Sequence, residues 1–364
     1  MRIKLVNLDN FRNHIKSQFE FSDDVTIITG KNGSGKTNIL ESIVLLTIAK
    51  STRTGLESEM VNLNSNYARV VGSVESQSQK NSDVTKLEVG LQRKDESRRI
   101  FKLFKVNSST RTSAKFIGTL KSVLFAPDDI RLVAGSPSRR REYLDRLLVQ
   151  VRPDYNRNLL KYNRILKHRN KLLDSIKGQA MRDIFEAQLD IWNSQLLESG
   201  IAIQKARSEF FSYSASHLAS ISQDLYENGF TLSLMYKKSE LSSDSLARVK
   251  NKELIYGTTQ IGPHRDDYVF VLNDKNKSFE LKGYGSRGQQ RTGVLCVKIL
   301  ENQYIKEVDK VSPVLLLDDI FSELDENYRK SLEKVINNQQ TIITTADINS
   351  VPASIKDRAK IIKL

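Results

Sequence analysis

A glycine-rich loop at residues 30–37, GKNGSGKT, carries the residue types that bind a nucleoside triphosphate. It fits the pattern G-x-x-x-x-G-K-[S/T], in which glycines let backbone N–H groups turn towards phosphate oxygens. Lys36 would reach the β- and γ-phosphates of ATP, and the Thr37 hydroxyl would bind Mg²⁺. The predicted nucleotide-binding residues are Gly30, Lys31, Asn32, Gly33, Ser34, Gly35, Lys36, Thr37 and Asn38.

The segments on both sides of this phosphate loop (residues 30–37) predict the strand and the helix that such a loop requires. Residues 25–29 are all β-branched and predict a buried strand, whereas residues 38–46 place apolar side chains at helical spacing. This context disfavours the alternative, which is a chance match of the pattern in an ordinary turn.

Two adjacent carboxylates, Asp318 and Asp319, follow an apolar run at residues 313–317. Ligands bind at the carboxyl ends of buried strands in α/β sheets, so we expect both acids to face the phosphate loop. Asp318 would hold Mg²⁺ together with Thr37, and Asp319 would orient or deprotonate the attacking water. Asp319 and Lys36 are therefore the candidate catalytic residues. The alternative is an acidic turn that caps a helix.

A second glycine-rich segment, residues 281–292, contains Ser-Arg-Gly-Gln-Gln from Ser286 at a predicted helix start. Glycines and a serine at a helix N-terminus form a nest of donors that suits phosphate. By itself this signal is weak, and its weight comes from the phosphate loop and the paired acids.

His264 is a candidate general base because it lies in a polar loop, GPHRDD, at residues 262–267. Beside Pro263 such a histidine is more often a structural hydrogen-bonding residue. We therefore favour the structural role for His264.

The charge balance indicates a polyanionic partner. The 364-residue chain has 57 Lys and Arg against 43 Asp and Glu, a formal net charge of +14. Nucleic acid is the favoured partner, although an anionic membrane surface fits the charge equally well. The single cysteine, Cys296, excludes an intramolecular disulfide and a cysteine metal cluster. The N-terminus resembles a strand rather than a signal peptide, and no apolar run could span a membrane, so we expect a soluble, cytoplasmic protein.

Much of the positive charge lies in residues 139–177, which contain twelve Lys and Arg but only four Asp and Glu. Apolar residues at helical spacing from Tyr155, and again from Ile184, predict a helical hairpin whose tyrosines pack inside. The charge surplus favours contact with DNA over the alternative of a solvated face above an ordinary core. The candidate DNA-binding residues are Arg139, Arg140, Arg141, Arg164 and Lys167.

The order of these motifs resembles that of ABC-type ATPases: phosphate loop, long insertion, S-x-G-Q, acid-ending strand and S-x-L-D. Thr37 and Ser286 are 249 positions apart, which favours the chromosome-maintenance branch with an inserted helical arm. Within that branch the chain resembles the RecF family of DNA replication and repair proteins. The matching segments are NFR at 10–12, GKNGSGKTNILE at 30–41, LFAPDDIRLVAGSPSRRREYLD at 124–145, GPHRDD at 262–267, SRGQQR at 286–291 and LLLDDIFSELD at 315–325.

This resemblance implies an α/β fold with two lobes. Lobe I, residues 1–135 and 255–364, would be a discontinuous ABC-type P-loop ATPase head with a mixed sheet. Lobe II, residues 136–254, would be a mainly helical arm inserted as a hairpin.

The resemblance also implies an ATP-dependent homodimer that holds two nucleotides, with the phosphate loop of one copy facing the signature of the other. The signature residues acting in trans would be Ser286, Arg287, Gly288, Gln289 and Gln290. The dimer-spanning D-loop would be Ser322, Glu323, Leu324 and Asp325. Binding of ATP and Mg²⁺ would close a positively charged groove on DNA, and hydrolysis would open it.

Two departures from the ABC pattern bear on this mechanism. Asp319 stands where transporters have glutamate, and its shorter reach leads us to expect slow hydrolysis that acts as a switch. The switch position near residues 344–347 lacks histidine, and the residue that replaces it stays open. The Gln-loop equivalent is expected around residues 125–129.

We therefore expect an ATP-dependent protein of recombinational repair and replication restart, connected with DNA damage and the SOS response. It would bind double-stranded DNA, gaps and single-strand/double-strand junctions in the nucleoid, with RecO- and RecR-type mediator proteins as partners and no membrane. An ABC-transporter-type subunit is the less favoured alternative, because the basic hairpin is unlike a short transporter subdomain. An SMC-like structural clamp is disfavoured because arms of about 45 residues reach only about 65 Å.

Overall fold

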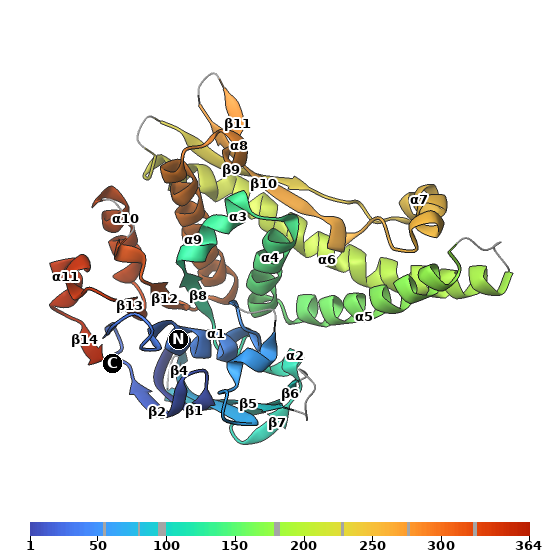
Figure 1. Ribbon diagram of the computed structural model, residues 1–364. Coiled ribbons are helices and arrows are strands. Elements are labelled where there is room, and N and C mark those ends of the chain that lie inside the picture. The colour runs from blue at the N-terminus through green and yellow to red at the C-terminus, as the bar shows by residue number, and fades with distance from the viewer. Residues whose placement is uncertain are drawn as a thin grey trace. The chain divides into compact units, whose positions relative to one another are not determined.

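The computed structural model describes residues 1–53, 56–78, 81–93, 100–177, 183–226, 229–274, 277–322 and 326–364. Packing divides the chain into two compact units (Figure 1), Met1–Asp129 with Leu295–Leu364, and Ile130–Val294. The division falls at other positions than the predicted lobe boundaries, since residues 255–294 lie in the second unit. No helix in the described ranges is long and apolar enough to cross a membrane.

A five-stranded parallel sheet forms the centre of the first unit, with the order β14-β3-β13-β12-β8. All three central strands are buried along most of their length, as their apolar runs predict. The strands are β3 (Val25–Thr29), β8 (Ser122–Phe125), β12 (Val314–Asp318), β13 (Thr341–Thr345) and β14 (Lys360–Lys363). The strand predicted at the C-terminus closes this sheet beside β3, as expected.

A six-stranded antiparallel sheet, in the order β2-β1-β4-β5-β6-β7, forms the other layer of the first unit. Its inner face is apolar because every second residue along a strand points to the same side and these residues are apolar. Val70 on β4 and Val89 on β5, which pair with each other, are two of them. The strands are β1 (Arg2–Phe11), β2 (His14–Glu20), β4 (Tyr67–Ser78), β5 (Asn81–Arg93), β6 (Ile100–Val106) and β7 (Ser109–Arg111).

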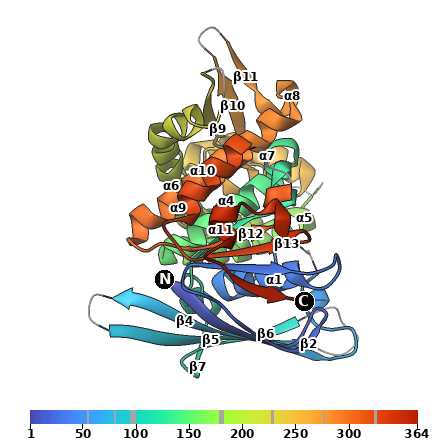
Figure 2. The same cartoon turned by 90° about the vertical axis from the view of Figure 1, so that its left-hand side faces the viewer.

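Helix α1 (Lys36–Ile48) lies between the two sheets and contacts strands of both (Figure 2). It is buried around most of its circumference, which explains why it is apolar on nearly all sides. Gly72 on β4 allows the close approach, since a Cβ atom there would lie 2.6 Å from Leu46 Cδ1. The remaining helices of the first unit are η1 (Glu57–Met60), α2 (Ser113–Phe116), η2 (Pro127–Ile130), η4 (Ile320–Ser322), α10 (Glu326–Ile336), η5 (Ile348–Ser350) and α11 (Ala353–Lys356).

The second unit combines helices with a three-stranded antiparallel sheet, in the order β11-β10-β9. Its strands are β9 (Thr231–Lys237), β10 (Asp267–Asn273) and β11 (Ser278–Glu280). Pairing of β9 with β10 joins residues on both sides of the predicted boundary at 254/255, and this pairing holds residues 267–273 in the second unit. Its short helices are α3 (Arg131–Ala134), η3 (Pro263–Arg265) and α8 (Leu281–Tyr284), and α9 (Arg287–Asp309) begins here and continues into the first unit.

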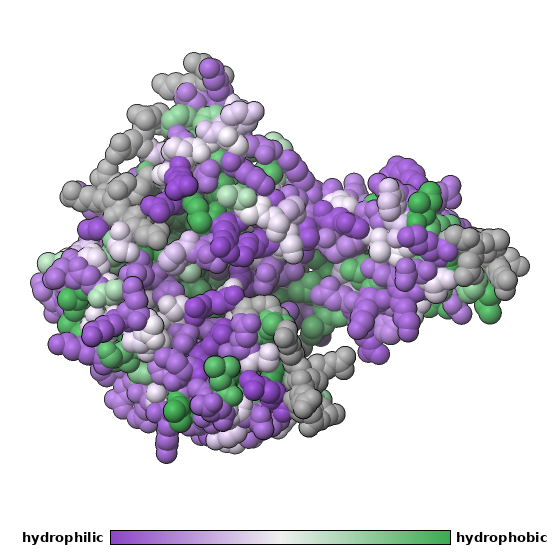
Figure 3. All heavy atoms as spheres, viewed as in Figure 1, coloured by the Kyte–Doolittle hydropathy of each residue, from purple (hydrophilic) through white to green (hydrophobic). Residues whose placement is uncertain are grey.

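The predicted helical hairpin is present as α5 (Pro153–Ser175) and the 41-residue α6 (Asp183–Gln223), which lie side by side (Figure 1). Helix α4 (Pro137–Val151) precedes them, and α7 (Ser243–Tyr256) packs on α5. Tyr155 and Tyr162 are buried, as predicted. The predicted turn near Gly178 lies outside the described residues. Figure 3 shows hydrophilic residues over much of this arm.

Candidate nucleotide-binding site

The phosphate loop connects β3 to α1 in a conformation that only glycine adopts without strain. Gly33 has a φ of 85° and Gly35 a φ of 103°, both in the left-handed region. Gly35 is the N-cap of α1, and no side chain caps the first turn. The N–H groups of Asn38 and Ile39 donate to Gly35 O, whereas those of Lys36 and Thr37 have no acceptor among the described residues. With the positive end of the helix dipole, these two N–H groups are available to an anion.

The turn between β1 and β2 supports the loop from the side. Asn13 Nδ2 donates to Ser34 O at 3.2 Å, and Asn13 Oδ1 accepts from Asn38 Nδ2 at 2.8 Å. His14 Nε2 lies 3.3 Å from Gly35 O, and burial lowers the pKa of this imidazole. Asn13 and His14 were not predicted, although they directly follow the NFR segment.

Lys36 and Ser34 have polar atoms turned towards the centre of the loop. Lys36 Nζ donates to the carbonyl oxygens of Gly30 at 2.7 Å and Lys31 at 3.0 Å. Ser34 Oγ is buried and has no hydrogen-bond partner among the described residues. An ammonium, an unpartnered hydroxyl and uncapped N–H groups are the donors that phosphate oxygens require, so these residues fit the triphosphate of ATP.

The first acid of the Walker B pair (Asp318 and Asp319) contacts the phosphate loop, although the two segments are 281 residues apart. Thr37 Oγ1 donates to Asp318 Oδ1 at 2.8 Å. Since Thr37 uses its only proton in this bond, the lone pairs of its oxygen stay available for Mg²⁺. Burial raises the pKa of Asp318, and the hydroxyls of Thr344 and Thr37 lower it.

The second acid, Asp319, has a left-handed backbone with a φ of 50°. Its N–H donates to Thr344 O at 3.0 Å, and its carbonyl accepts from Ser322 Oγ at 2.8 Å. No residue in the described ranges donates a hydrogen bond to its carboxylate, so both of its oxygens can accept a proton from a water molecule. Of the predicted D-loop, Ser322 is described and exposed, whereas Glu323, Leu324 and Asp325 lie outside the described residues.

A buried carboxylate on α1, Glu41, binds Arg12 in the turn between β1 and β2. Arg12 donates from Nε to Glu41 Oε2 at 2.9 Å and from Nη2 to Oε1 at 2.7 Å. Arg53 Nη1 donates to Asn38 Oδ1 at 2.8 Å. Asn38, predicted to bind nucleotide, therefore has both side-chain atoms in bonds within the protein.

The signature segment forms the N-terminus of α9 in the second unit. Ser286 N donates to Gln289 Oε1 at 2.9 Å, and Gln289 N donates to Ser286 Oγ at 3.2 Å, which is a reciprocal helix cap. Gln290 Nε2 donates to Gly285 O at 3.1 Å. Ser286, Arg287 and Gly288 are exposed, and within the described part of the chain a Cβ atom at Gly288 would meet only Ser286 Oγ, at 3.9 Å. The helix predicted to open at Leu281 is interrupted, since α8 ends at Tyr284 and α9 begins at Arg287.

Comparison with known proteins agrees with this geometry. Residues 2–360 match the model of the RecF/RecN/SMC N-terminal domain. The chain is 35% identical over 377 residues to the DNA replication and repair protein RecF of Bacillus cereus (strain AH820), covering 100% of this chain and 96% of that protein. RecF of Bacillus thuringiensis (strain Al Hakam) matches with the same identity and coverage.

The chain belongs to the RecF family.

Solved structures of RecF have the same fold as this chain. The recombination mediator protein RecF of the RecFOR pathway, solved with ATPγS, has a TM-score of 0.85 at 32% identity, covering 96% of this chain and 94% of that one. The structure solved with ATP also has a TM-score of 0.85. An SMC head domain derived from Pyrococcus furiosus, at 16% identity and a TM-score of 0.53, shares the fold alone. The predicted ABC-type α/β fold is confirmed.

Arg140, one of the predicted DNA-binding residues of this RecF-family chain, is not exposed to DNA. Its guanidinium is buried and donates to both carboxylate oxygens of Asp267, at 2.7 and 2.9 Å, and to Gly135 O at 2.9 Å. Arg141 Nη1 donates to Asp266 O at 2.9 Å, so it too is partly engaged. Arg139 is half-buried, whereas Arg164 and Lys167 are exposed on α5. A basic run in a sequence does not separate ion-paired arginines from solvent-facing ones.

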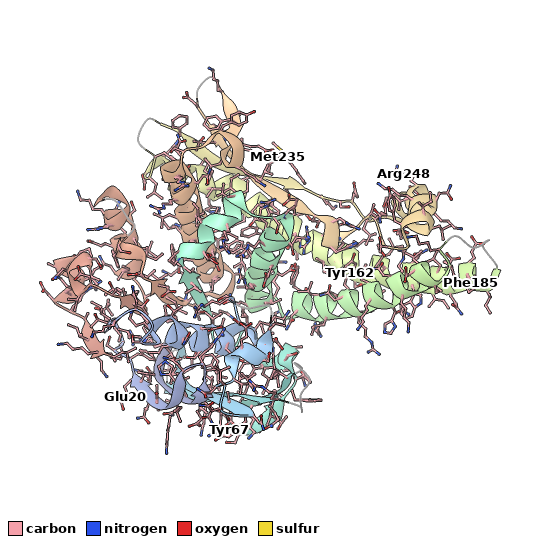
Figure 4. The ribbon with its side chains drawn as sticks, viewed as in Figure 1. Glu20, Tyr67, Tyr162, Phe185, Met235 and Arg248 are labelled. Carbon is pink, nitrogen blue, oxygen red and sulfur yellow. The ribbon has the colours of Figure 1, made fainter. Side chains whose placement is uncertain are left out.

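His264 has both ring nitrogens occupied, which agrees with the structural role favoured above. Nδ1 lies 2.7 Å from the hydroxyl of Tyr162, labelled in Figure 4, and Nε2 lies 3.1 Å from Thr259 O. Since a carbonyl only accepts, Nε2 carries the proton and Nδ1 accepts from the tyrosine. Burial lowers the pKa of His264 to about 4, which keeps the ring neutral near pH 7.

Proposed function

We propose that this RecF-family chain is an Mg²⁺-dependent ATPase that binds DNA in recombinational repair and replication restart. The observation that carries the proposal is the bond of 2.8 Å between Thr37 and Asp318. Beside it stands the carboxylate of Asp319, which accepts no hydrogen bond from any residue that the structure describes. This arrangement supports nucleotide binding with metal-assisted hydrolysis rather than a purely structural role for the acids. Bound Mg²⁺ would neutralise charge that develops on the phosphates.

The site would be completed by a second copy of the chain. Lys36 and Thr37 of one copy would bind the phosphates, while Ser286, Gly288 and Gln289 of the other would donate to the γ-phosphate. Exposure of the α9 N-terminus, with open space at Gly288, supports this assignment. Two copies would therefore close on ATP and open after hydrolysis, so that turnover sets the lifetime of the dimer.

Slow hydrolysis follows from the length of the Asp319 side chain. Aspartate is one methylene shorter than the glutamate of transporters, so its carboxylate reaches less far from the end of β12 towards an attacking water. Misplacing a general base by about 1 Å can cost about 100-fold in rate. We therefore assign the ATPase a switch role, in which the ATP-bound dimer persists on DNA.

DNA at gaps and single-strand/double-strand junctions would be the bound polyanion, given the net charge of +14. The two similar solved structures are described as the recombination mediator protein RecF in the RecFOR pathway, which supports RecO- and RecR-type mediators as partners and a cytoplasmic, nucleoid-associated location.

Mixing two inactive variants tests the trans site. Lys36→Ala removes the phosphate-loop ammonium and Ser286→Arg blocks the signature, so each variant alone should lose turnover. A 1:1 mixture should regain about a quarter of the wild-type sites, because half of randomly paired dimers contain one intact site. Turnover that stays at the level of the separate variants, while both chains form mixed dimers, would contradict the trans assignment.

DNA binding needs its own measurement. Affinity for gapped duplex should be higher with ATP than with ADP, and should fall as salt rises. Lys36→Ala should show no difference between the two nucleotides. Equal affinity of the wild-type chain with ATP and ADP would contradict the switch.

A further inference from the structure

Thr344 contacts the Walker B pair from the neighbouring strand. It lies at the C-terminal end of β13, in register with Asp318 on β12, and is buried with 1% of its surface exposed. Its Oγ1 donates to Asp318 Oδ1 at 2.7 Å, the same oxygen that accepts from Thr37 at 2.8 Å. Asp318 Oδ1 thus has a hydroxyl donor from each of two elements, which sets the rotation of the carboxylate.

Thr344 also binds the backbone of Asp319. Asp319 N donates to Thr344 O at 3.0 Å and to Thr344 Oγ1 at 3.2 Å. A non-glycine residue with a φ of 50° keeps this conformation only when its surroundings determine it. Thr344 accepts from the N–H of Asp319, and Ser322 Oγ donates to its carbonyl at 2.8 Å, so the direction of the Asp319 carboxylate depends on both residues.

We propose that Thr344 is a positioning residue for the ATPase reaction, whose hydroxyl orients Asp318 for the metal and whose backbone and hydroxyl orient Asp319 for the attacking water. The inference rests on the proposed function. It also gives a role to the segment where ABC-type ATPases carry a switch histidine and this chain does not. Thr344 would therefore act on the reaction by contacting Asp318 and Asp319, and not by contacting the γ-phosphate.

A buried threonine that only fills space predicts a different outcome. Thr341, at the other end of β13, provides the comparison because it is equally buried, and its hydroxyl lies 3.3 Å from Gln339 O. Thr344→Val and Thr341→Val make the same change of hydroxyl to methyl in one strand. Both should lower the melting temperature, but only the first should alter metal binding and turnover.

The experiment uses the full chain and measures three quantities. Binding of Mn²⁺, as a paramagnetic substitute for Mg²⁺, is followed by electron paramagnetic resonance in the presence of ATP, together with ATP affinity and kcat. Removing a group that orients a metal-binding carboxylate typically weakens metal affinity or activity about 10- to 100-fold. We expect that loss in Thr344→Val, with ATP affinity in the absence of metal unchanged, and recovery in Thr344→Ser.

Wild-type Mn²⁺ affinity and kcat in Thr344→Val would overturn the inference, as would equal losses in Thr341→Val. If Thr344→Val does not fold, the alanine variants of both positions give the same comparison. The Mn²⁺ measurement also separates this inference from the proposed function. A wild-type chain that bound Mn²⁺ with ATP but showed no turnover would contradict the ATPase, while the comparison of Mn²⁺ affinities would still decide the role of Thr344.

Discussion

Arg140 of α4 and Asp267 of β10 form an ion pair through two parallel hydrogen bonds, Nε to Oδ1 at 2.7 Å and Nη2 to Oδ2 at 2.9 Å. The arginine side chain is 5% exposed and the aspartate 20%, so the pair lies almost out of water. It connects the start of the basic segment to the loop that carries His264. The pair therefore belongs to the internal structure of the second unit.

Arg140→Ala should destabilise the chain, because it leaves a largely buried carboxylate without its partner. We expect a loss of about 3 kcal/mol in the free energy of unfolding, the scale for breaking a buried ion pair. Lys161→Ala removes an exposed pair with Glu198 in the same unit and should cost at most about 1 kcal/mol. Chemical denaturation measures the free energy of unfolding of both variants. Equal losses would contradict the prediction that the buried pair contributes more to stability than the exposed pair.

Arg164→Gln and Lys167→Gln should weaken DNA binding without lowering the melting temperature. Both side chains are exposed on α5, so neither is needed to fill the interior. Each phosphate contact that is lost should reduce the slope of log affinity against log salt by about 1. Lys16→Gln, which removes one positive charge at an exposed position of β2, is the control for each single variant. Unchanged affinity in the double variant would remove α5 from the DNA-binding surface.

Gly35→Ala should abolish ATP binding. A Cβ atom at Gly35 would lie 2.7 Å from the Asn13 amide and from His14 Nε2, at a φ of 103°. Gly33→Ala is the matched control, because Gly33 also has a positive φ, of 85°, but apart from its chain neighbours no atom of the described residues lies within 4 Å of its Cβ position. Gly33→Ala should therefore carry only the backbone strain of about 1 kcal/mol. Titration with a fluorescent ATP analogue compares the two, and similar affinities would show that crowding is unimportant.

His264 should make the second unit less stable in acid. Its folded-state pKa of about 4 lies below the unfolded value near 6.5, so the unfolded chain binds more protons between these values. The contribution is fully present above pH 6.5 and is lost as the pH falls towards 4, by about 3 kcal/mol in total. His264→Gln lacks this titration. Urea unfolding at pH 7.5 and pH 5 should show a smaller pH-dependent loss in the variant than in the wild type.

The phosphate loop, the Walker B pair and the buried strands beside them were predictable because their signals are local. The spacing of the glycines predicts the backbone conformation of the loop. A short apolar run before paired acids predicts a buried strand and places the acids at its carboxyl end, where ligands bind. The helical hairpin was predictable for the same reason, since apolar spacing in α5 and α6 reports which faces are buried. Arg140 shows where local signals fail. Its neighbours in sequence predict a solvent-facing basic cluster, whereas its partner, Asp267, lies 127 positions away.

What the sequence by itself determined about this protein is the chemistry that it can do: a loop for phosphates, two acids for a metal and a water, and a positive arm. These follow from residue types and spacings of a few positions. Only the tertiary structure decided which polar groups meet. Thr344 lies against Asp318 and Asp319 because β13 pairs in parallel with β12, and Asn13 and His14 lie against Gly35 because the β1–β2 turn reaches the loop. Such contacts depend on strand order and register, which no short stretch of sequence encodes.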